Sequence, residues 1–290
     1  MASSNSGLSP LMKLNDGRSM PQLGLGLMRF GGEDQTVSVI NNAVKAGYRL
    51  FDTAAVYGTE PQTGEAFRGL KALRSELFLT TKLWNDSHGK DAPIRAFNAS
   101  MERFGLEYLD LYLMHWPLPM LDKYVDTWRA MIKLRSEGRV KSIGVSNFTE
   151  QHLQRIIDET GEVPAVNQVE MHPYFQQRPL RKFHDKHGIV TQAWSPMGGS
   201  FVKMLDEPVV GTLAQKHGRT PSEIVLAWHI TCGVSLIPKA TSTKHLAENM
   251  AAYEVKLNED DVAALSALDR ADGRAGPAPD KFDMGAQREA

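Results

Sequence analysis

Eight short apolar segments follow one another along this chain, each succeeded by a stretch with helical periodicity and none separated by a linker. Nearly continuous apolar runs are typical of parallel strands that are buried on both faces. Because eight such units in unbroken order suit a closed barrel better than an open sheet, they predict an α/β fold, a (β/α)8 TIM barrel. The predicted strands are GLGLM (24–28), YRLFDT (48–53), LFLTTK (77–82), LDLYLMH (109–115), KSIGVSN (141–147), AVNQVE (165–170), IVTQAW (189–194) and VSLIPK (234–239).

Two segments of different character flank the repeating part. LMKLNDGRSMPQL has a turn signal at Asn15-Asp16-Gly17 between short apolar runs, which predicts an N-terminal β-hairpin. After Leu268 the composition becomes rich in Gly, Pro and charge, which predicts a short irregular C-terminal tail. We therefore expect a flexible N-terminus at 1–10, a single barrel domain with its hairpin at 11–268, and a tail at 269–290. Whether the tail covers one end of the barrel is left open.

Composition excludes several classes of protein. The chain has 290 residues, 42% of them hydrophobic and 23% charged, and a net charge of −1. With Lys and Arg dispersed, these values predict a globular protein that binds neither nucleic acid nor membrane. A single cysteine, Cys232, cannot form an internal disulfide, and the first residues lack the pattern of an export signal. The expected compartment is the cytoplasm.

Polar side chains stand where the predicted strands end. The carboxyl ends of barrel strands all open on one face, so residues that close the apolar runs should lie together. Taken one at a time, each fits an ordinary solvated strand end or packed core residue; taken together, they predict an active site. They are Asp52 with Tyr57 shortly after it, Lys82, His115, Ser146, Asn147, Gln168, Glu170, Trp194, Ser195 and Lys239.

Four of these residues have the chemistry of a proton-transfer site. A tyrosine is a weak acid at neutral pH, and an ammonium beside it, here Lys82, would favour the phenolate. A buried lysine needs a carboxylate, and Asp52 on the adjacent strand can supply one. His115 could then orient a carbonyl oxygen towards Tyr57. The pattern predicts protonation of a carbonyl group.

Several motifs in fixed order resemble those of the aldo-keto reductase superfamily, over nearly the whole chain from Met20 to about Leu268. They are GYRLFDTA with Tyr57 and Glu60, TKLWN, LYLMHWP, KSIGVSNF, AVNQVEMHPY, WSPMG and IPKATSTKHLAEN. TKLWND and AWSPMG look most like the bacterial reductases that include 2,5-diketo-D-gluconate reductases. The resemblance implies NADPH-dependent reduction of aldehydes and ketones to alcohols. It also implies a catalytic tetrad of Asp52, Tyr57, Lys82 and His115, with Tyr57 as the general acid.

The resemblance further implies a nicotinamide cofactor bound without a Rossmann domain. This agrees with GLGLMRFGG, which lacks the third glycine of G-x-G-x-x-G. The implied cofactor residues at the strand ends are Ser146, Asn147 and Gln168, which hold the carboxamide, Trp194, which stacks on the nicotinamide, and Ser195.

On the adenosine side the chain departs from the family pattern. Lys239 and Ser242 suit the 2′-phosphate, and Glu248 and Asn249 suit adenine. The family commonly has Ser or Thr after the lysine and Arg six positions after it, where this chain has Ala240 and His245. Histidine is only partly protonated near neutral pH and grips phosphate less well than a guanidinium. We therefore expect NADPH with some tolerance of NADH.

The substrate side is readable only in part. Met28, Trp84 and Trp116 follow strand ends beside the tetrad and predict an apolar, aromatic mouth for a small carbonyl compound. Candidate substrates are keto-sugars such as 2,5-diketo-D-gluconate, methylglyoxal-like dicarbonyls, and small or aromatic aldehydes. The histidines do not group with cysteines or carboxylates at metal-ligand spacing, so no metal is expected. We expect the protein to be a monomer.

Two other functions remain open at this stage. A Schiff-base lyase or aldolase could use Lys82 or Lys239 as the amine nucleophile. A barrel that binds the cofactor could instead serve as a regulatory subunit with incidental catalysis. The complete tetrad argues against the second.

Overall fold

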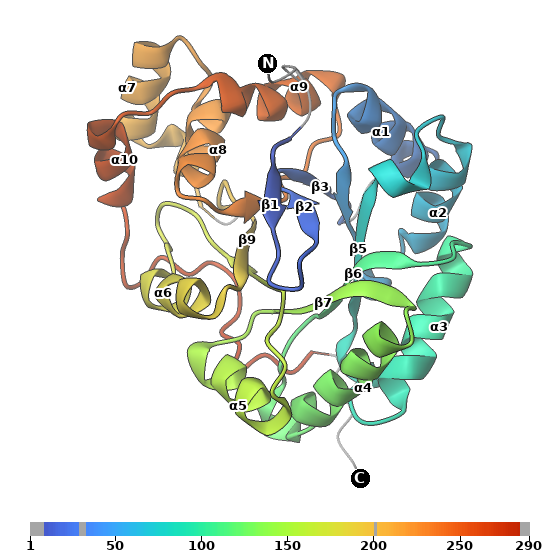
Figure 1. Cartoon of the computed structure of the whole chain (residues 1–290). Coiled ribbons are helices and arrows are strands. Elements are labelled where there is room, and N and C mark those ends of the chain that lie inside the picture. Colours follow the sequence, from blue (N-terminus) through green and yellow to red (C-terminus); the bar gives the residue numbers. More distant parts are fainter. Residues whose placement is uncertain (1–8, 29–32, 200–201, 285–290) are drawn as a thin grey trace.

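The eight predicted strands form one parallel sheet in chain order. The computed structural model describes residues 9–28, 33–199 and 202–284. Leu23 forms a parallel bridge with Leu236, whose backbone N–H donates to the carbonyl of Gln22 at 2.9 Å, so the two edge strands meet and the barrel closes (Figure 1). The strands are β3 (Gly24–Gly26), β4 (Leu50–Asp52), β5 (Phe78–Leu83), β6 (Leu109–Met114), β7 (Val140–Ser146), β8 (Val166–Glu170), β9 (Val190–Trp194) and β10 (Ser235–Leu236).

Helices surround the sheet. Those that complete the eight units are α1 (Glu33–Lys45), α2 (Glu60–Gly69), α3 (Ala92–Phe104), α4 (Tyr124–Ser136), α5 (Glu150–Thr160), α6 (Arg178–His187), α8 (Pro221–Thr231) and α9 (Thr243–Ala251). Two further helices, α7 (Pro208–His217) and α10 (Glu259–Ser266), lie where the sequence suggested only connections. In the part of the chain that the structure describes, no helix has both the length and the apolar character needed to cross a membrane.

Both faces of the strands are buried, which explains the continuous apolar runs. Along β6, Leu111 and Leu113 belong to a cluster inside the barrel, whereas Tyr112 and Met114 belong to the larger layer between sheet and helices. This is the alternation expected of consecutive strand residues. The inner cluster is small, so the carboxyl ends of the strands are left for polar groups.

The predicted hairpin closes the opposite end of the barrel. It consists of β1 (Leu11–Lys13) and β2 (Ser19–Pro21), which pair antiparallel. Met20 is fully buried in the inner cluster. Asn15 Nδ2 donates to Pro164 O at 2.9 Å and Ser142 Oγ donates to Asp16 at 2.6 Å, which ties the turn to segments beside the amino ends of β8 and β7. The hairpin therefore covers the amino-terminal end of the barrel, away from the carboxyl ends of the strands that carry the polar residues.

The structure describes most of the C-terminal tail but only the last residues of the expected N-terminal segment. Of the N-terminus expected to be flexible, residues 1–8 lie outside the described part, and Ser9 is buried, with its Oγ accepting from Leu23 N and paired with Tyr253 OH, both at 2.8 Å. The tail is irregular over 269–284, as predicted, and residues 285–290 lie outside the described part.

The contact between α2 and α3 provides a test of the packing. A Cβ on Gly64 would lie 2.0 Å from the carbonyl oxygen of Phe104. We expect Gly64→Ala to lower the free energy of unfolding by about 1–3 kcal/mol, because the two helix backbones must separate. Gly69→Ala in the same helix is the matched control, since a Cβ there meets nothing within 4 Å. Thermal denaturation of both variants checks this; equal melting temperatures would contradict the close approach.

Candidate active site

A buried ion pair joins β4 and β5. Asp52 ends β4, and Lys82 lies in β5 two residues beyond Thr80, the residue that pairs with Asp52, so both side chains point to the same face. Lys82 Nζ donates to Asp52 Oδ1 and to the carbonyl of Thr53 at 2.9 Å. The side chain of Asp52 is 2% exposed and that of Lys82 is 0% exposed. The structure thus brings together the carboxylate and the ammonium that the sequence suggested as partners.

Gln168 on β8 completes the surroundings of Asp52. Its Nε2 donates to Asp52 Oδ2 at 2.8 Å and to Gln192 Oε1 at 2.7 Å. Burial raises the pKa of the Asp52 carboxyl above its ordinary value, while the charge and hydrogen bond of Lys82 and the hydrogen bond of Gln168 act in the opposite direction. The carboxylate therefore depends on Lys82 for its charged state.

Tyr57 and His115 face each other above this pair. Tyr57 ends a 3-10 turn (Ala55–Tyr57) that directly follows β4, and its ring is partly exposed. The hydroxyl lies 3.5 Å from His115 Nε2, and Lys82 Nζ lies 5.2 Å from the centre of the tyrosine ring. All four residues of the predicted tetrad converge at the ends of three adjacent strands, β4 to β6.

His115 is held as a neutral imidazole. Burial, followed by the charge of Lys82, lowers its pKa well below the ordinary value. Among the described residues, its Nδ1 has no hydrogen-bond partner, whereas Nε2 faces Tyr57. A neutral ring with its proton on Nε2 can donate one hydrogen bond into the space beside the tyrosine hydroxyl.

The residues at the ends of β7 and β9 form a hydrogen-bonded network. Asn147 Nδ2 donates to the carbonyl of His115 at 3.0 Å and to Ser146 Oγ at 3.1 Å. Trp194 Nε1 donates to Asn147 Oδ1 at 2.9 Å, which fixes the orientation of the indole. Asn147 and Ser195 have positive φ values of 62° and 47°. Non-glycine residues in this conformation cost energy and concentrate at functional sites.

The predicted adenosine residues lie around the start of α9. Lys239, Ser242 and His245 are exposed, and Ser242 caps the helix by accepting from His245 N at 3.1 Å. Glu248 pairs with Lys244 at 3.7 Å, and Asn249 is buried and hydrogen-bonds Tyr48. A helix N-terminus flanked by exposed basic groups attracts anionic ligands.

The three predicted substrate residues lie in different environments. Met28 is 48% exposed. Trp84 packs edge-on against His115 with ring centres 5.1 Å apart. Trp116 is buried, and Phe282 of the tail lies on its ring, with centres 4.1 Å apart. Sequence reasoning missed Phe282, and its only signal was an aromatic residue in an otherwise polar tail.

The tail crosses the same end of the barrel. Arg270 N donates to Tyr174 O at 3.1 Å, Asp280 lies 3.2 Å from His152 Nε2, and Asn85 Nδ2 donates to Met284 O at 2.7 Å. In Figure 1 the tail runs from α10 past α6 and α5. The question that the sequence left open is answered: the tail covers part of the face that carries the tetrad.

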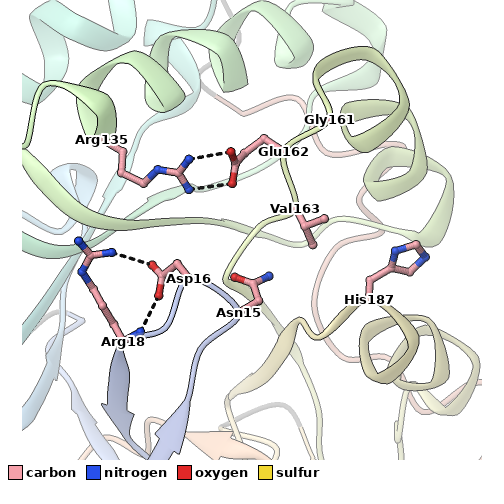
Figure 2. A pocket seen from close by; sticks show the side chains of 8 residues that line it. All are labelled: Asn15, Asp16, Arg18, Arg135, Gly161, Glu162, Val163 and His187. Atoms are coloured by element: carbon pink, nitrogen blue, oxygen red, sulfur yellow. Dashed lines mark hydrogen bonds and ion pairs between the residues drawn. The ribbon is translucent and has the colours of Figure 1, made fainter.

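A hollow of about 500 Å³ lies at the other end of the barrel, beside the hairpin. Figure 2 shows that its charged side chains pair with one another, Arg135 with Glu162 and Arg18 with Asp16. The amino-terminal end of such barrels usually serves stability rather than catalysis. No group of three or more His, Cys, Asp or Glu side chains that could hold a metal ion occurs within the described ranges.

The fold and the strand-end residues define a class: (β/α)8-barrel proteins built for proton transfer beside a buried lysine. The model of the Aldo/keto reductase family matches residues 22–270. The chain belongs to this family. It is 45% identical to the methylglyoxal reductase DkgA of Salmonella typhimurium, over 94% of this chain and 98% of that protein. It is also 45% identical to an aldo-keto reductase of Mycolicibacterium smegmatis, over 96% of this chain and 99% of that protein.

Solved structures agree with this assignment. The apo form of Gox0644 has a TM-score of 0.89 and 46% identity, over 94% of this chain and 98% of that chain. An Asp→Ala variant of Gox0644 in complex with NADPH has the same TM-score, with 45% identity and the same coverage. An aldo/keto reductase from Brucella melitensis has a TM-score of 0.86 and 46% identity, over 90% of this chain and 98% of that chain.

Proposed function

We propose that this protein reduces aldehydes and ketones to alcohols with NADPH, and that small α-dicarbonyl compounds are among its substrates. The observation that carries the proposal is the placement of Tyr57 Oη beside a neutral His115 and a buried Lys82–Asp52 pair. The names of the DkgA relatives support the dicarbonyl class.

The four residues divide the proton transfer between them. Tyr57 and His115 Nε2 lie 3.5 Å apart, so one carbonyl oxygen between them can accept a hydrogen bond from each. Tyr57 then gives its proton to that oxygen, and the charge of Lys82, 5.2 Å from the ring centre, stabilises the phenolate that remains. Asp52 pairs with Lys82 in a site where an isolated ammonium would be costly.

The polar residues of the site fit a nicotinamide dinucleotide. Trp194 presents a fixed indole beside Asn147 and Ser146, which carry the amide and hydroxyl groups that a carboxamide can bind. Lys239 and His245 at the start of α9 suit a phosphate. When bound, NADPH supplies the hydride. Gln168 directs its amide nitrogen to Asp52 and Gln192, so its contribution would come through its oxygen.

The geometry does not favour Lys82 as the amine nucleophile of the Schiff-base alternative. Lys82 Nζ donates to a carboxylate and a carbonyl and is fully buried, which leaves no free amine to attack a substrate. A regulatory barrel without catalysis would not need the tetrad. Borohydride trapping with a carbonyl substrate tests the first alternative, and NADPH binding without turnover would support the second.

A screen of NADPH oxidation tests the proposal directly. The substrates are methylglyoxal-like dicarbonyls, keto-sugars including 2,5-diketo-D-gluconate, aldoses, and aromatic aldehydes. We expect turnover, with the dicarbonyls among the substrates used. Lack of turnover with every class would refute carbonyl reduction as the function.

Position 245 is expected to set the cofactor preference. Replacing a bidentate charged contact by a weaker one should cost on the order of 1–3 kcal/mol of phosphate recognition. NADH has no 2′-phosphate, so His245→Arg should tighten NADPH binding and leave NADH binding unchanged. Dissociation constants of both cofactors for both proteins check this, and equal NADPH affinity of the two proteins would show that position 245 does not touch the phosphate.

We also propose that the protein acts as a monomer in the cytoplasm. The four tetrad residues come together within one chain, which supports a monomer. Light scattering coupled to gel filtration tests the first point, and cell fractionation tests the second.

A further inference from the structure

Glu170, at the end of β8, binds the tail through a buried carboxylate. Its side chain is 1% exposed, and its hydrogen bonds go to residues outside the tetrad. The carboxylate accepts from Ala275 N at 2.6 Å, from Gly276 N at 2.8 Å and from His172 Nε2 at 3.0 Å. Two consecutive backbone amides of the tail therefore converge on one acidic side chain.

The tail fits this place closely. A Cβ on Gly276 would lie 2.5 Å from Trp194 Cη2 and 2.9 Å from Glu170 Oε2. A Cβ on Gly273 would lie 1.8 Å from the carbonyl oxygen of Tyr174. Only glycine lets the backbone approach so near at both points, and the tail backbone consequently lies against the edge of the Trp194 indole.

The ion pair that also holds the tail, between Asp280 and His152, is more exposed than the contacts of Glu170. Asp280, which pairs with His152, has a side chain that is 64% exposed, and surface ion pairs contribute little. Burial alone would raise the pKa of Glu170, but the hydrogen bonds from His172 and from the two tail amides outweigh it and hold the pKa below the ordinary value. Hydrogen bonds to an ionised acceptor are about twice as strong as neutral ones.

We propose that Glu170 is a positioning residue of this site: it fastens the tail over the mouth, so that residues 275–284 cover the edge of Trp194 and the face of Trp116. The tail then forms one wall of the substrate entrance. The expected effect of Glu170 on catalysis rests on the proposed function. Its attachment of the tail rests only on the contacts described above.

Two variants of the full chain test the inference by different routes. Glu170→Gln keeps the shape but replaces one acceptor oxygen by an NH2 group, and Gly276→Ala forces the tail off Trp194. Trypsin cleavage after Arg274 and Lys281, followed by mass spectrometry, reports release of the tail. We expect cleavage to be faster by roughly tenfold or more in both variants, since hydrogen bonds to a charged group are lost in one and displaced in the other. KM for carbonyl substrates should rise several-fold, with a smaller change in kcat.

Glu223→Gln is the matched control. Glu223 is also a buried carboxylate, and it accepts from Thr220 N at 2.7 Å and Thr220 Oγ1 at 2.8 Å at the start of α8. Among the described residues its side chain has no hydrogen bond or ion pair with the tail. The Glu223→Gln variant should be less stable than the wild type, while its rate of tail cleavage and its KM stay at wild-type values. Wild-type cleavage or wild-type KM in both test variants would overturn the inference. Cleavage needs no turnover, so an inactive wild-type protein would refute the proposed function while the cleavage rates still decide whether Glu170 fastens the tail.

Discussion

Tyr57→Phe is expected to lose nearly all carbonyl reduction while binding NADPH as the wild type does. The change removes one hydroxyl group and keeps the partly exposed ring in its place beside His115. General acid catalysis is typically worth about 10²- to 10⁴-fold in rate, so kcat should fall by that factor. Steady-state kinetics with a dicarbonyl and cofactor titration by fluorescence measure the two quantities separately.

Tyr112→Phe is the control for the loss of a tyrosine hydroxyl. Tyr112 lies in β6 on the side that faces α3, and among the described residues its hydroxyl has no hydrogen-bond partner. Its removal should leave kcat unchanged and should not lower stability. If Tyr57→Phe kept turnover close to that of Tyr112→Phe, Tyr57 would not be the acid.

Lys82→Met is expected to abolish turnover and to destabilise the fold. The phenolate of Tyr57 loses its neighbouring charge, and Asp52 is left buried without its partner. Removing one member of a buried ion pair typically costs about 3–5 kcal/mol. The free energy of unfolding from urea titration and kcat together measure both effects.

The loss of stability in Lys82→Met should depend on pH. Burial raises the pKa of Asp52, and without Lys82 only the hydrogen bond from Gln168 opposes that effect, so the pKa of Asp52 should rise further in the variant. A carboxyl with a raised pKa in the folded state stabilises the fold fully below its unfolded pKa, and this contribution is lost as pH rises through the folded value. The deficit relative to wild type should therefore be larger at pH 8 than at pH 5.

A double variant separates folding from catalysis. Lys82→Met with Asp52→Asn removes the uncompensated charge, so it should recover part of the stability but no turnover. Should the double variant regain activity, the coupling between Lys82 and Tyr57 proposed here would be wrong.

The barrel and the convergence of the four tetrad residues could be predicted because both depend on local signals. Each strand is an apolar run, and Asp52, Lys82 and His115 stand where a run ends. The helix α10 could have been found by the same method, since Asn258 and Asp261 form a capping box at its start. The helix α7 gives a weaker signal, because Gly211 lies in its interior.

The role of the tail could not be read in this way. Glu170 and Ala275 are separated by 105 positions, and no local pattern pairs them. The same holds for Phe282 on Trp116 and for the amide of Gln168, whose partners Asp52 and Gln192 come from different strands. Such contacts follow from the closed barrel, which brings strand ends and tail to one face.

The closure of the barrel between its first strand, β3, and its last strand, β10, has a consequence for synthesis of the chain. Leu23 and Leu236 close the sheet, and a Cβ on Gly26 would lie 2.9 Å from the carbonyl oxygen of Ile237. At typical translation rates of about 5–20 residues per second, β3 leaves the ribosome on the order of ten to forty seconds before its partner β10. Throughout that interval the edge of β3 has no strand beside it, and unpaired edges of this kind invite aggregation. A nascent chain stalled before residue 236 should therefore bind chaperones that recognise exposed strands, and release them once β10 emerges.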